Sequence, residues 1–132
     1  MKIINIFIIG LSLMSVSVRA DDDCSKSTND PELFSCVKKN RAITEKELNY
    51  EYAEARKRIE KVFSSEPEIK KQYQKIFLES QRGWLTYREN QCKIYAHVAD
   101  KSSNPYILFT NDCANKINKA RIDELRKIPY DG

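Results

Sequence analysis

The segment Gln81-Arg82-Gly83-Trp84-Leu85-Thr86-Tyr87-Arg88-Glu89-Asn90-Gln91-Cys92 is the most informative part of this chain. It contains the only tryptophan, and it places Gln81, Trp84, Arg88 and Cys92 three, four and four residues apart. These are the steps between neighbours on one face of an α-helix. A Trp, an Arg and a Cys that share one helical stripe predict a small helical domain held together by disulfides.

The first 20 residues have the features of a signal peptide. Lys2 supplies the positive start, residues 3–16 are mostly apolar, and Val18-Arg19-Ala20 resembles a cleavage site of small residues. The alternative is a membrane anchor, which would need about 20 apolar residues. We therefore predict cleavage after Ala20 and a single mature domain over residues 21–132. This domain is expected to be periplasmic or secreted, without stable membrane insertion after cleavage.

The predicted mature chain is close to electrically neutral. The full sequence has 23 Lys and Arg against 19 Asp and Glu, and residues 1–20 contain two of the basic residues and no acid. The mature balance is therefore 21 against 19, or +2. Acidic and basic residues also alternate along the chain, which is typical of solvated helix faces. We expect no nucleic-acid partner, because such proteins usually concentrate basic residues on one face.

All four cysteines, Cys24, Cys36, Cys92 and Cys113, lie after the predicted cleavage site. An even number in a short exported chain predicts two disulfides, and four cysteines allow three connectivities. Cys92 and Cys113 lie about ten residues before and after an expected turn at residues 102–103. In an antiparallel helical hairpin, such equidistant residues lie side by side and can be bridged. The favoured pairs are therefore Cys92 with Cys113 and Cys24 with Cys36.

Periodicity predicts an all-α fold, a small antiparallel bundle of about three helices braced by the two disulfides. The expected helices run from about Pro31 to Phe63, from Pro67 to about Asp100, and from about Pro105 to Ile128. The expected N-caps are Asn29 or Asp30 for the first helix, and Ser64 or Ser65 for the second. The stripe expected to face inward on the second helix consists of Ile69, Tyr73, Ile76, Phe77, Trp84, Arg88, Cys92 and Tyr95.

Two residues of the central segment each allow two interpretations. Gly83 costs about 1 kcal/mol relative to Ala inside a helix, so it indicates either the close approach of another helix or simple tolerance. Arg88 is either structural, packed on Trp84 and paired with an acid, or it faces a ligand or partner. The structural interpretation is favoured. The acids considered as its partners are Glu47, Glu51, Asp123 and Glu124, and the tyrosines considered as an exposed partner surface are Tyr87, Tyr95, Tyr106 and Tyr130.

The sequence contains no motif that is typical of catalysis or metal binding. His97 is the only histidine, and the cysteines form no C-x-x-C pair that would indicate a metal or redox site. Glu79 and Glu89 flank Trp84, but a glycosidase needs two carboxylates placed across a cleft, and these are expected to be solvated. We therefore predict a protein that is not an enzyme and has no catalytic residue, metal or cofactor. It is expected to bind another protein through residues that the sequence does not identify.

These features resemble the lysozyme inhibitor LprI N-terminal domain family, a group of small exported bacterial proteins. The matching features are Cys24 and Cys36, the core Gln81-x-x-Trp84-x-x-x-Arg88 with Cys92 after it, and Cys113 followed by Arg121 and Leu125. The stretch after Cys36 departs from the family. Family members tend to have a leucine-aspartate element leading into a tyrosine, where this chain has Glu45, Glu47 and Leu48 before Tyr52.

The resemblance implies an α-helical exported binding protein that inhibits host-type lysozyme by protein–protein contact. A second hypothesis is a periplasmic structural, stress or immunity-type protein with another protein partner, and a third is a small cell-wall hydrolase. Lysozymes of this type are strongly basic, and charge complementarity assists association. A mature chain near neutrality would need a local acidic patch for this, and Asp21-Asp22-Asp23 is a candidate, with a frayed terminus as the alternative.

Overall fold

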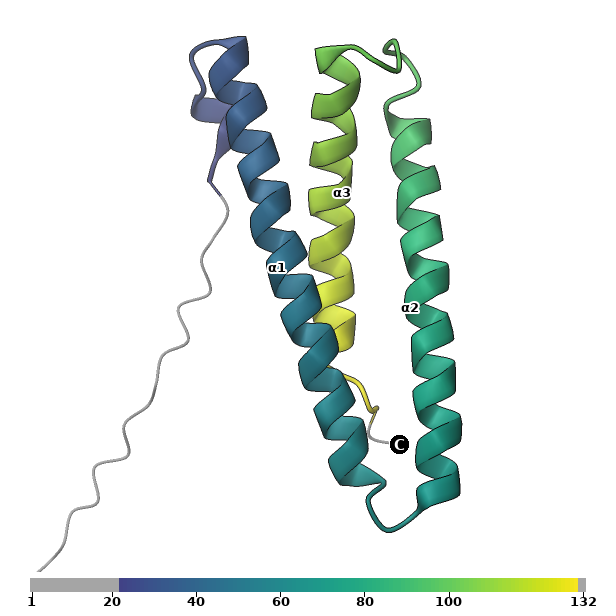
Figure 1. The fold of residues 1–132 in the computed structure, drawn as a ribbon. Coiled ribbons are helices and arrows are strands. Elements are labelled where there is room, and N and C mark those ends of the chain that lie inside the picture. The colour runs from purple at the N-terminus through teal and green to yellow at the C-terminus, as the bar shows by residue number, and fades with distance from the viewer. Residues whose placement is uncertain (1–21, 131–132) are drawn as a thin grey trace, which may run out of the picture.

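The computed structural model describes residues 22–130, so the predicted signal peptide lies outside the described residues. A short 3-10 turn, η1 (Cys24–Lys26), precedes three helices, α1 (Asp30–Val62), α2 (Pro67–Tyr95) and α3 (Asn104–Leu125). Each helix runs antiparallel to the one before it, and α3 is the shortest (Figure 1). Residues 22–130 contain no β-strand, and the predicted all-α bundle of three helices is confirmed.

Local sequence explains where α1 and α3 begin. The Asn29 side chain accepts a hydrogen bond from the Glu32 backbone N–H at 2.9 Å, and the Glu32 carboxylate accepts one from the Thr28 backbone N–H at 2.9 Å. This reciprocal arrangement satisfies backbone donors that a helix start leaves free. The Ser103 side chain caps α3 in the same way, by accepting from the Tyr106 N–H. The prediction of Asn29 as the N-cap of α1 is thus confirmed.

Three predictions about the helix ends are wrong. The N-cap position of α2 is Glu66 rather than Ser64 or Ser65, and its side chain makes no capping hydrogen bond. α2 ends at Tyr95 rather than near Asp100, because the backbone tightens into turns in which the His97 N–H donates to the Ile94 carbonyl. α3 ends at Leu125 rather than Ile128, because the backbone tightens into turns in which the Lys127 N–H donates to the Glu124 carbonyl.

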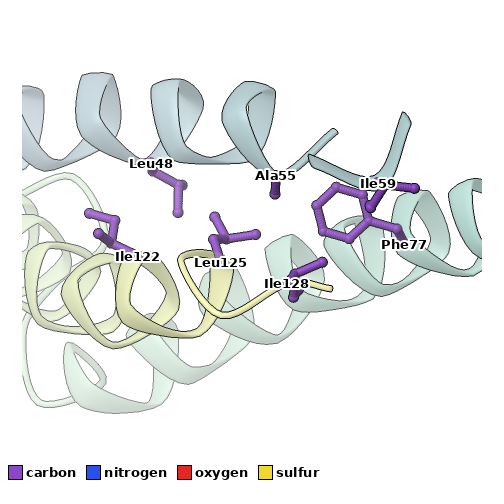
Figure 2. Close-up of a cluster of buried hydrophobic side chains, with 7 residues drawn as sticks. All are labelled: Leu48, Ala55, Ile59, Phe77, Ile122, Leu125 and Ile128. Atoms are coloured by element: carbon purple, nitrogen blue, oxygen red, sulfur yellow. The ribbon is translucent and has the colours of Figure 1, made fainter. Parts of the chain in front are cut away.

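The apolar core lies at the end of the bundle that holds the α1–α2 turn. Its seven buried residues come from all three helices and the tail after α3 (Figure 2): Leu48, Ala55, Ile59, Phe77, Ile122, Leu125 and Ile128. Two aromatic pairs border this cluster, with ring centroids 4.7 Å apart for Tyr52 and Phe77, and 5.0 Å apart for Phe63 and Tyr73. We call this part of the molecule the apolar end.

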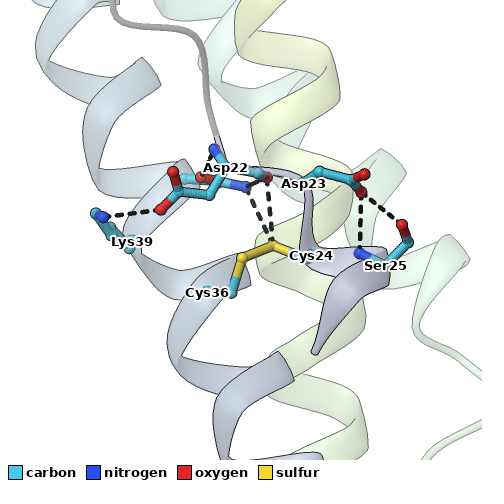
Figure 3. The surroundings of a disulfide bond; sticks show 7 residues. Asp22, Asp23, Cys24, Ser25, Cys36 and Lys39 are labelled. Atoms are coloured by element: carbon cyan, nitrogen blue, oxygen red, sulfur yellow. Dashed lines mark hydrogen bonds and ion pairs between the residues drawn. A yellow bond between two sulfur atoms is a disulfide. The ribbon is translucent and has the colours of Figure 1, made fainter. Parts of the chain in front are cut away.

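Two disulfides brace the opposite end of the bundle, which we call the disulfide end. Cys24–Cys36 links η1 to the first turns of α1, and Cys92–Cys113 links α2 to α3, with Cα atoms 5.7 and 5.5 Å apart. Figure 3 shows that the chain before Cys24 is also held, because Lys39 pairs with Asp22 at 2.8 Å. The Asp22 backbone N–H donates to the Asn40 side chain at 2.9 Å. The expectation of a frayed terminus is therefore wrong for residues 22–24.

The inward-facing stripe predicted for α2 is correct only in part. Phe77, Arg88 and Cys92 are buried, and Tyr73 and Trp84 are half-buried. Three other predicted members, Ile69, Ile76 and Tyr95, are exposed. The reason is that α2 is an outer helix that packs on α3 and α1 along one side only (Figure 1). A second apolar stripe on α2 therefore stays exposed.

Candidate functional site

The residues of the central segment meet inside the bundle, on the face of α2 that is turned towards α1 and α3. Gln81 and Arg88 are 9% and 5% exposed, and Trp84 between them is half-buried. Their spacing of three and four residues places them on successive turns of this one face. The structure thus brings together the three residues that sequence analysis singled out, and it adds partners from the other two helices.

Arg88 is the centre of a hydrogen-bond network that joins all three helices. Its Nη1 donates to both carboxylate oxygens of Glu45 on α1 at 3.0 Å and to Oδ1 of Asn118 on α3 at 2.8 Å. Asn118 donates in turn through Nδ2 to Glu45 at 2.9 Å and to the Thr44 hydroxyl at 3.2 Å. Because a planar guanidinium has several fixed donors, one arginine can fix the register of three helices.

Two guanidinium groups lie close to the ring of Trp84. The Cζ atoms of Arg88 and Arg121 are 5.2 and 5.8 Å from the centroid of its ring, within the range of cation–π attraction. Arg121, on α3, donates from Nε to the Gln81 side chain at 3.1 Å and from Nη1 to Glu124 at 2.8 Å. The Gln81, Trp84 and Arg88 side chains are therefore each held by a residue of α3.

The acids predicted to pair with Arg88 are not its partners. Glu47, Glu51 and Asp123 all pair with Arg126, whereas Glu124 pairs with Arg121. The acidic partners of Arg88 are Glu45 on α1 and the adjacent Glu89, whose carboxylate accepts from Nη2 at 3.3 Å. Helical periodicity does not show which acid of one helix faces an arginine of another, so Glu45 was not singled out. The one available signal was its place in the stretch where the chain departs from the family pattern.

Glu45 is ionised more easily than an ordinary glutamate. Partial burial raises its pKa, but hydrogen bonds from Asn118 and Arg88, with the positive charges of Arg88 and Arg41, outweigh burial and lower the pKa below its usual value. The two members of this ion pair differ in burial: the side chain of Arg88 is 6% exposed, and that of Glu45 is 36% exposed. Glu45 is thus held as a carboxylate that neutralises a buried guanidinium.

A small pocket of about 150 Å³ borders this network, and its only carboxylate belongs to Glu89. The pocket is lined by Arg41, Arg88, Glu89, Cys92, Lys93, Tyr106, Thr110 and Ala114. Glu79 and His97 lie at exposed positions outside it. Within residues 22–130, no group of three or more His, Cys, Asp or Glu is arranged to hold a metal ion.

The two remaining expectations concern Gly83 and the tyrosines. A Cβ atom built on Gly83 would meet no atom within 4 Å, so the idea of a close helix approach is wrong within this chain. The tyrosines considered as a partner surface do not form one: Tyr106 is half-buried, and Tyr130 follows α3 at the apolar end of the bundle. None of the helices in residues 22–130 is long and apolar enough to cross a membrane.

These observations define a class of protein, a small three-helix bundle with two disulfides and a buried Gln–Trp–Arg network. The family model described as "Lysozyme inhibitor LprI" matches residues 21–125, and the chain belongs to this family. A similar solved structure is a DUF1311 family protein from Pseudomonas putida KT2440, with a TM-score of 0.68 and 22% identity. The match covers 83% of this chain and 100% of that one. No curated protein matches the chain.

Proposed function

We propose that the mature chain is an exported, non-catalytic protein that inhibits lysozyme by protein–protein contact. The observation that carries this proposal is the family match over residues 21–125, which runs from the predicted cleavage site to the last residue of α3. Two disulfides support export, because such bonds persist in oxidising compartments and are rare in the cytosol. The predicted signal peptide provides the route.

In this proposal the Gln81–Trp84–Arg88 network is the scaffold of the inhibitor and not its contact surface. Gln81 and Arg88 are at most 9% exposed, and Gln81 Oε1 and Arg88 Nη1 are hydrogen-bonded to residues of α1 and α3. A protein partner can bind only residues that it can reach, so the target is contacted by the outer faces of the helices. A rigid scaffold lowers the entropy lost when such a surface binds.

The acidic start of the mature chain contributes little to this contact. Asp22 is paired with Lys39 at 2.8 Å, and the Asp23 carboxylate accepts hydrogen bonds from the Ser25 hydroxyl and backbone N–H at 2.6 and 3.1 Å. The hydroxyl and backbone hydrogen bonds from Ser25 lower the pKa of Asp23, so its carboxylate is engaged in the local turn. We therefore expect inhibition to depend on shape and apolar contact, with a modest response to salt.

The test is a lysozyme activity assay with purified mature protein whose disulfides are intact. We expect inhibition to saturate near an equimolar ratio, and a sample that has been reduced and alkylated provides the control for the braced fold. Full lysozyme activity at a large molar excess of folded inhibitor would overturn the proposal. A pull-down from periplasmic extract would then identify the partner of the alternative hypothesis.

The same preparation tests the non-catalytic part of the proposal. Incubated with purified peptidoglycan in the absence of lysozyme, it should release no soluble glycan fragments. Release that increases with protein concentration and survives further purification would make the chain a cell-wall hydrolase instead.

A further inference from the structure

The outer side of α2 carries an apolar stripe that nothing in the chain covers. Ile69, Ile76, Tyr87 and Ile94 are 46%, 66%, 55% and 69% exposed, although soluble proteins usually place such residues inside. Ser80 and Gly83 lie in the middle of the stripe and are also exposed, with the Ser80 hydroxyl at its edge accepting a hydrogen bond from Nη2 of Arg121 at 3.2 Å. Successive members are three, four or seven residues apart, so they share one face of the helix. We call these six residues, with Gln72 and Gln91, the outer stripe of α2.

The outer stripe is symmetric about its centre. In order, its residues are Ile69, Gln72, Ile76, Ser80, Gly83, Tyr87, Gln91 and Ile94, with spacings of three, four, four, three, four, four and three. The side-chain types are symmetric too: an Ile stands at each end, a Gln comes next, then a large apolar residue, and two small residues form the centre. A two-fold interface must be self-complementary in this way, since each copy presents the same patch to the other.

We propose that the outer stripe is a homodimer interface in which two copies of α2 pack antiparallel across a two-fold axis between Ser80 and Gly83. In this register Ile69 faces Ile94 of the second copy, Ile76 faces Tyr87, and Ser80 faces Gly83. Each large side chain thus meets an apolar partner. The two glutamines, Gln72 and Gln91, face each other as uncharged polar groups, so no like charges are opposed along the stripe.

The small central residues explain how two helices approach closely at this point. A Cβ atom on Gly83 would meet no atom of its own chain within 4 Å, so the space in front of it is open to another molecule. Ser80 is the other small residue, and the two face each other at the proposed crossing. Helix axes pack about 8–10 Å apart, nearer when small side chains lie at the contact. Within the bundle, nothing requires a glycine at residue 83. In the proposed dimer, its missing side chain lets the two helices approach closely.

The size of the stripe sets the expected strength. From Ile69 to Ile94 it is about 37 Å long at 1.5 Å per residue, and a helix is about 10 Å wide. Two copies would bury about 800 Å² in total, less than the about 1,200 Å² of stable complexes. The dimer is therefore weak and reversible, with a dissociation constant in the range of tens to hundreds of micromolar.

A second copy fits the stripe better than lysozyme does. The stripe has no charged residue, so no like charges oppose each other when it packs against a second copy. Internal symmetry also has no value in binding an asymmetric partner. The dimer is independent of the proposed inhibition, and its test requires no lysozyme.

Sedimentation equilibrium of the mature protein, with disulfides intact, tests the dimer from about 1 µM to about 1 mM, a range that spans the expected dissociation constant. We expect a monomer–dimer equilibrium, and Tyr87→Glu should raise the dissociation constant at least about tenfold. The matched control is Tyr50→Glu on α1, since Tyr50 is a helical tyrosine with 59% exposure, against 55% for Tyr87. The control should leave the dissociation constant unchanged, and circular dichroism should show native helicity in both variants.

The double variant Ile76→Glu/Tyr87→Lys tests the antiparallel register. In the proposed dimer each introduced carboxylate faces an introduced ammonium, so the double variant should dimerise more tightly than Ile76→Glu alone. In a parallel pair, like charges would face each other, and the second substitution would weaken association further. That result would contradict the proposed register.

Two results would overturn the dimer itself. One is a wild-type protein that remains monomeric at about 1 mM, well above the expected dissociation constant. Another is an equal weakening of the dimer by Tyr50→Glu and Tyr87→Glu.

Discussion

The two ends of the bundle are held together by different means. At the apolar end, seven buried apolar residues and two aromatic pairs fill the space between the helices. At the disulfide end, the buried cluster consists of Cys92, Cys113 and Ala114, with Ile117 packed against it. The buried residues that surround it are largely polar: Asn40, Thr44, Asn111, Asn115 and Asn118. Both disulfides lie at this second end.

The difference shows where covalent links are most useful. Burying apolar surface stabilises a fold by about 25 cal/mol per Å², so side-chain packing is the main stabilising contribution at the apolar end. The disulfide end buries amides, whose hydrogen bonds replace bonds to water and contribute only about 1 kcal/mol each. A disulfide acts mainly by restricting the unfolded chain and needs no large apolar core. The Arg88 network lies between these two regions.

The largest effect is expected from a cavity at the apolar end. Leu125 is fully buried in the cluster, and Leu125→Ala should lower the free energy of unfolding by about 3–5 kcal/mol. The matched substitution near the disulfide end is Ile117→Ala, at a half-buried position, with an expected loss of about 1–2 kcal/mol. Urea unfolding of the oxidised proteins measures both. Equal losses would mean that the two ends are packed alike.

Removal of the interhelical disulfide should have the next largest effect. Cys92→Ala/Cys113→Ala opens a link between residues 21 apart in sequence and should cost about 3 kcal/mol. Cys24→Ala/Cys36→Ala opens a shorter loop of 12 residues at a more exposed site and should cost less, about 2 kcal/mol. Thermal unfolding of the two double variants compares them. A larger loss for the Cys24–Cys36 pair would contradict the entropic argument.

The charged network between the two ends predicts a dependence on pH. The pKa of Glu45 is lower in the folded protein than in the unfolded chain, so its contribution is present above about pH 5 and is lost as pH falls through the folded pKa. Because Glu45 is partly exposed, Glu45→Gln should cost only about 1 kcal/mol near pH 7.

The measurement is denaturant unfolding of wild type and Glu45→Gln between pH 2.5 and 7. The gap between the two proteins should narrow towards acid, because the wild type loses the ionised carboxylate there and the variant has none to lose. Glu79→Gln, at an exposed position on α2, serves as the control for a general charge effect. A gap of constant size across this range would contradict the role given to Glu45.

The smallest expected effect is a gain in stability, whereas the substitutions above are expected to lower it. Gly83→Ala should raise the free energy of unfolding by about 0.5–1 kcal/mol, since alanine is the better helix former and its Cβ would meet no atom within 4 Å. Denaturant unfolding should be measured at low micromolar protein concentration, where the proposed dimer is dissociated. A loss of stability there would show that residue 83 is packed against its own chain.

Much of the bundle could be predicted because its signals are local. Helix starts depend on a few neighbouring residues, as at Asn29, and the pairing of Cys92 with Cys113 follows from their equal distance to one turn. The burial of Arg88 was also predictable from its place on the stripe with Trp84. Its partner was not, because Glu47 and Glu51 on the same helix as Glu45 were equally plausible before α1 was placed against α2.

By itself, the sequence determined the three helices, the cysteine pairs and the membership in the lysozyme inhibitor LprI family, since periodicity and spacing are properties of the chain. Only the tertiary structure decided which apolar residues of α2 are covered. Ile76 and Phe77 are adjacent and similar in hydrophobicity, yet one is 66% exposed and the other 4%. The physical reason is that three helices can bury only one side of an outer helix, and the packing of α1 and α3 selects that side.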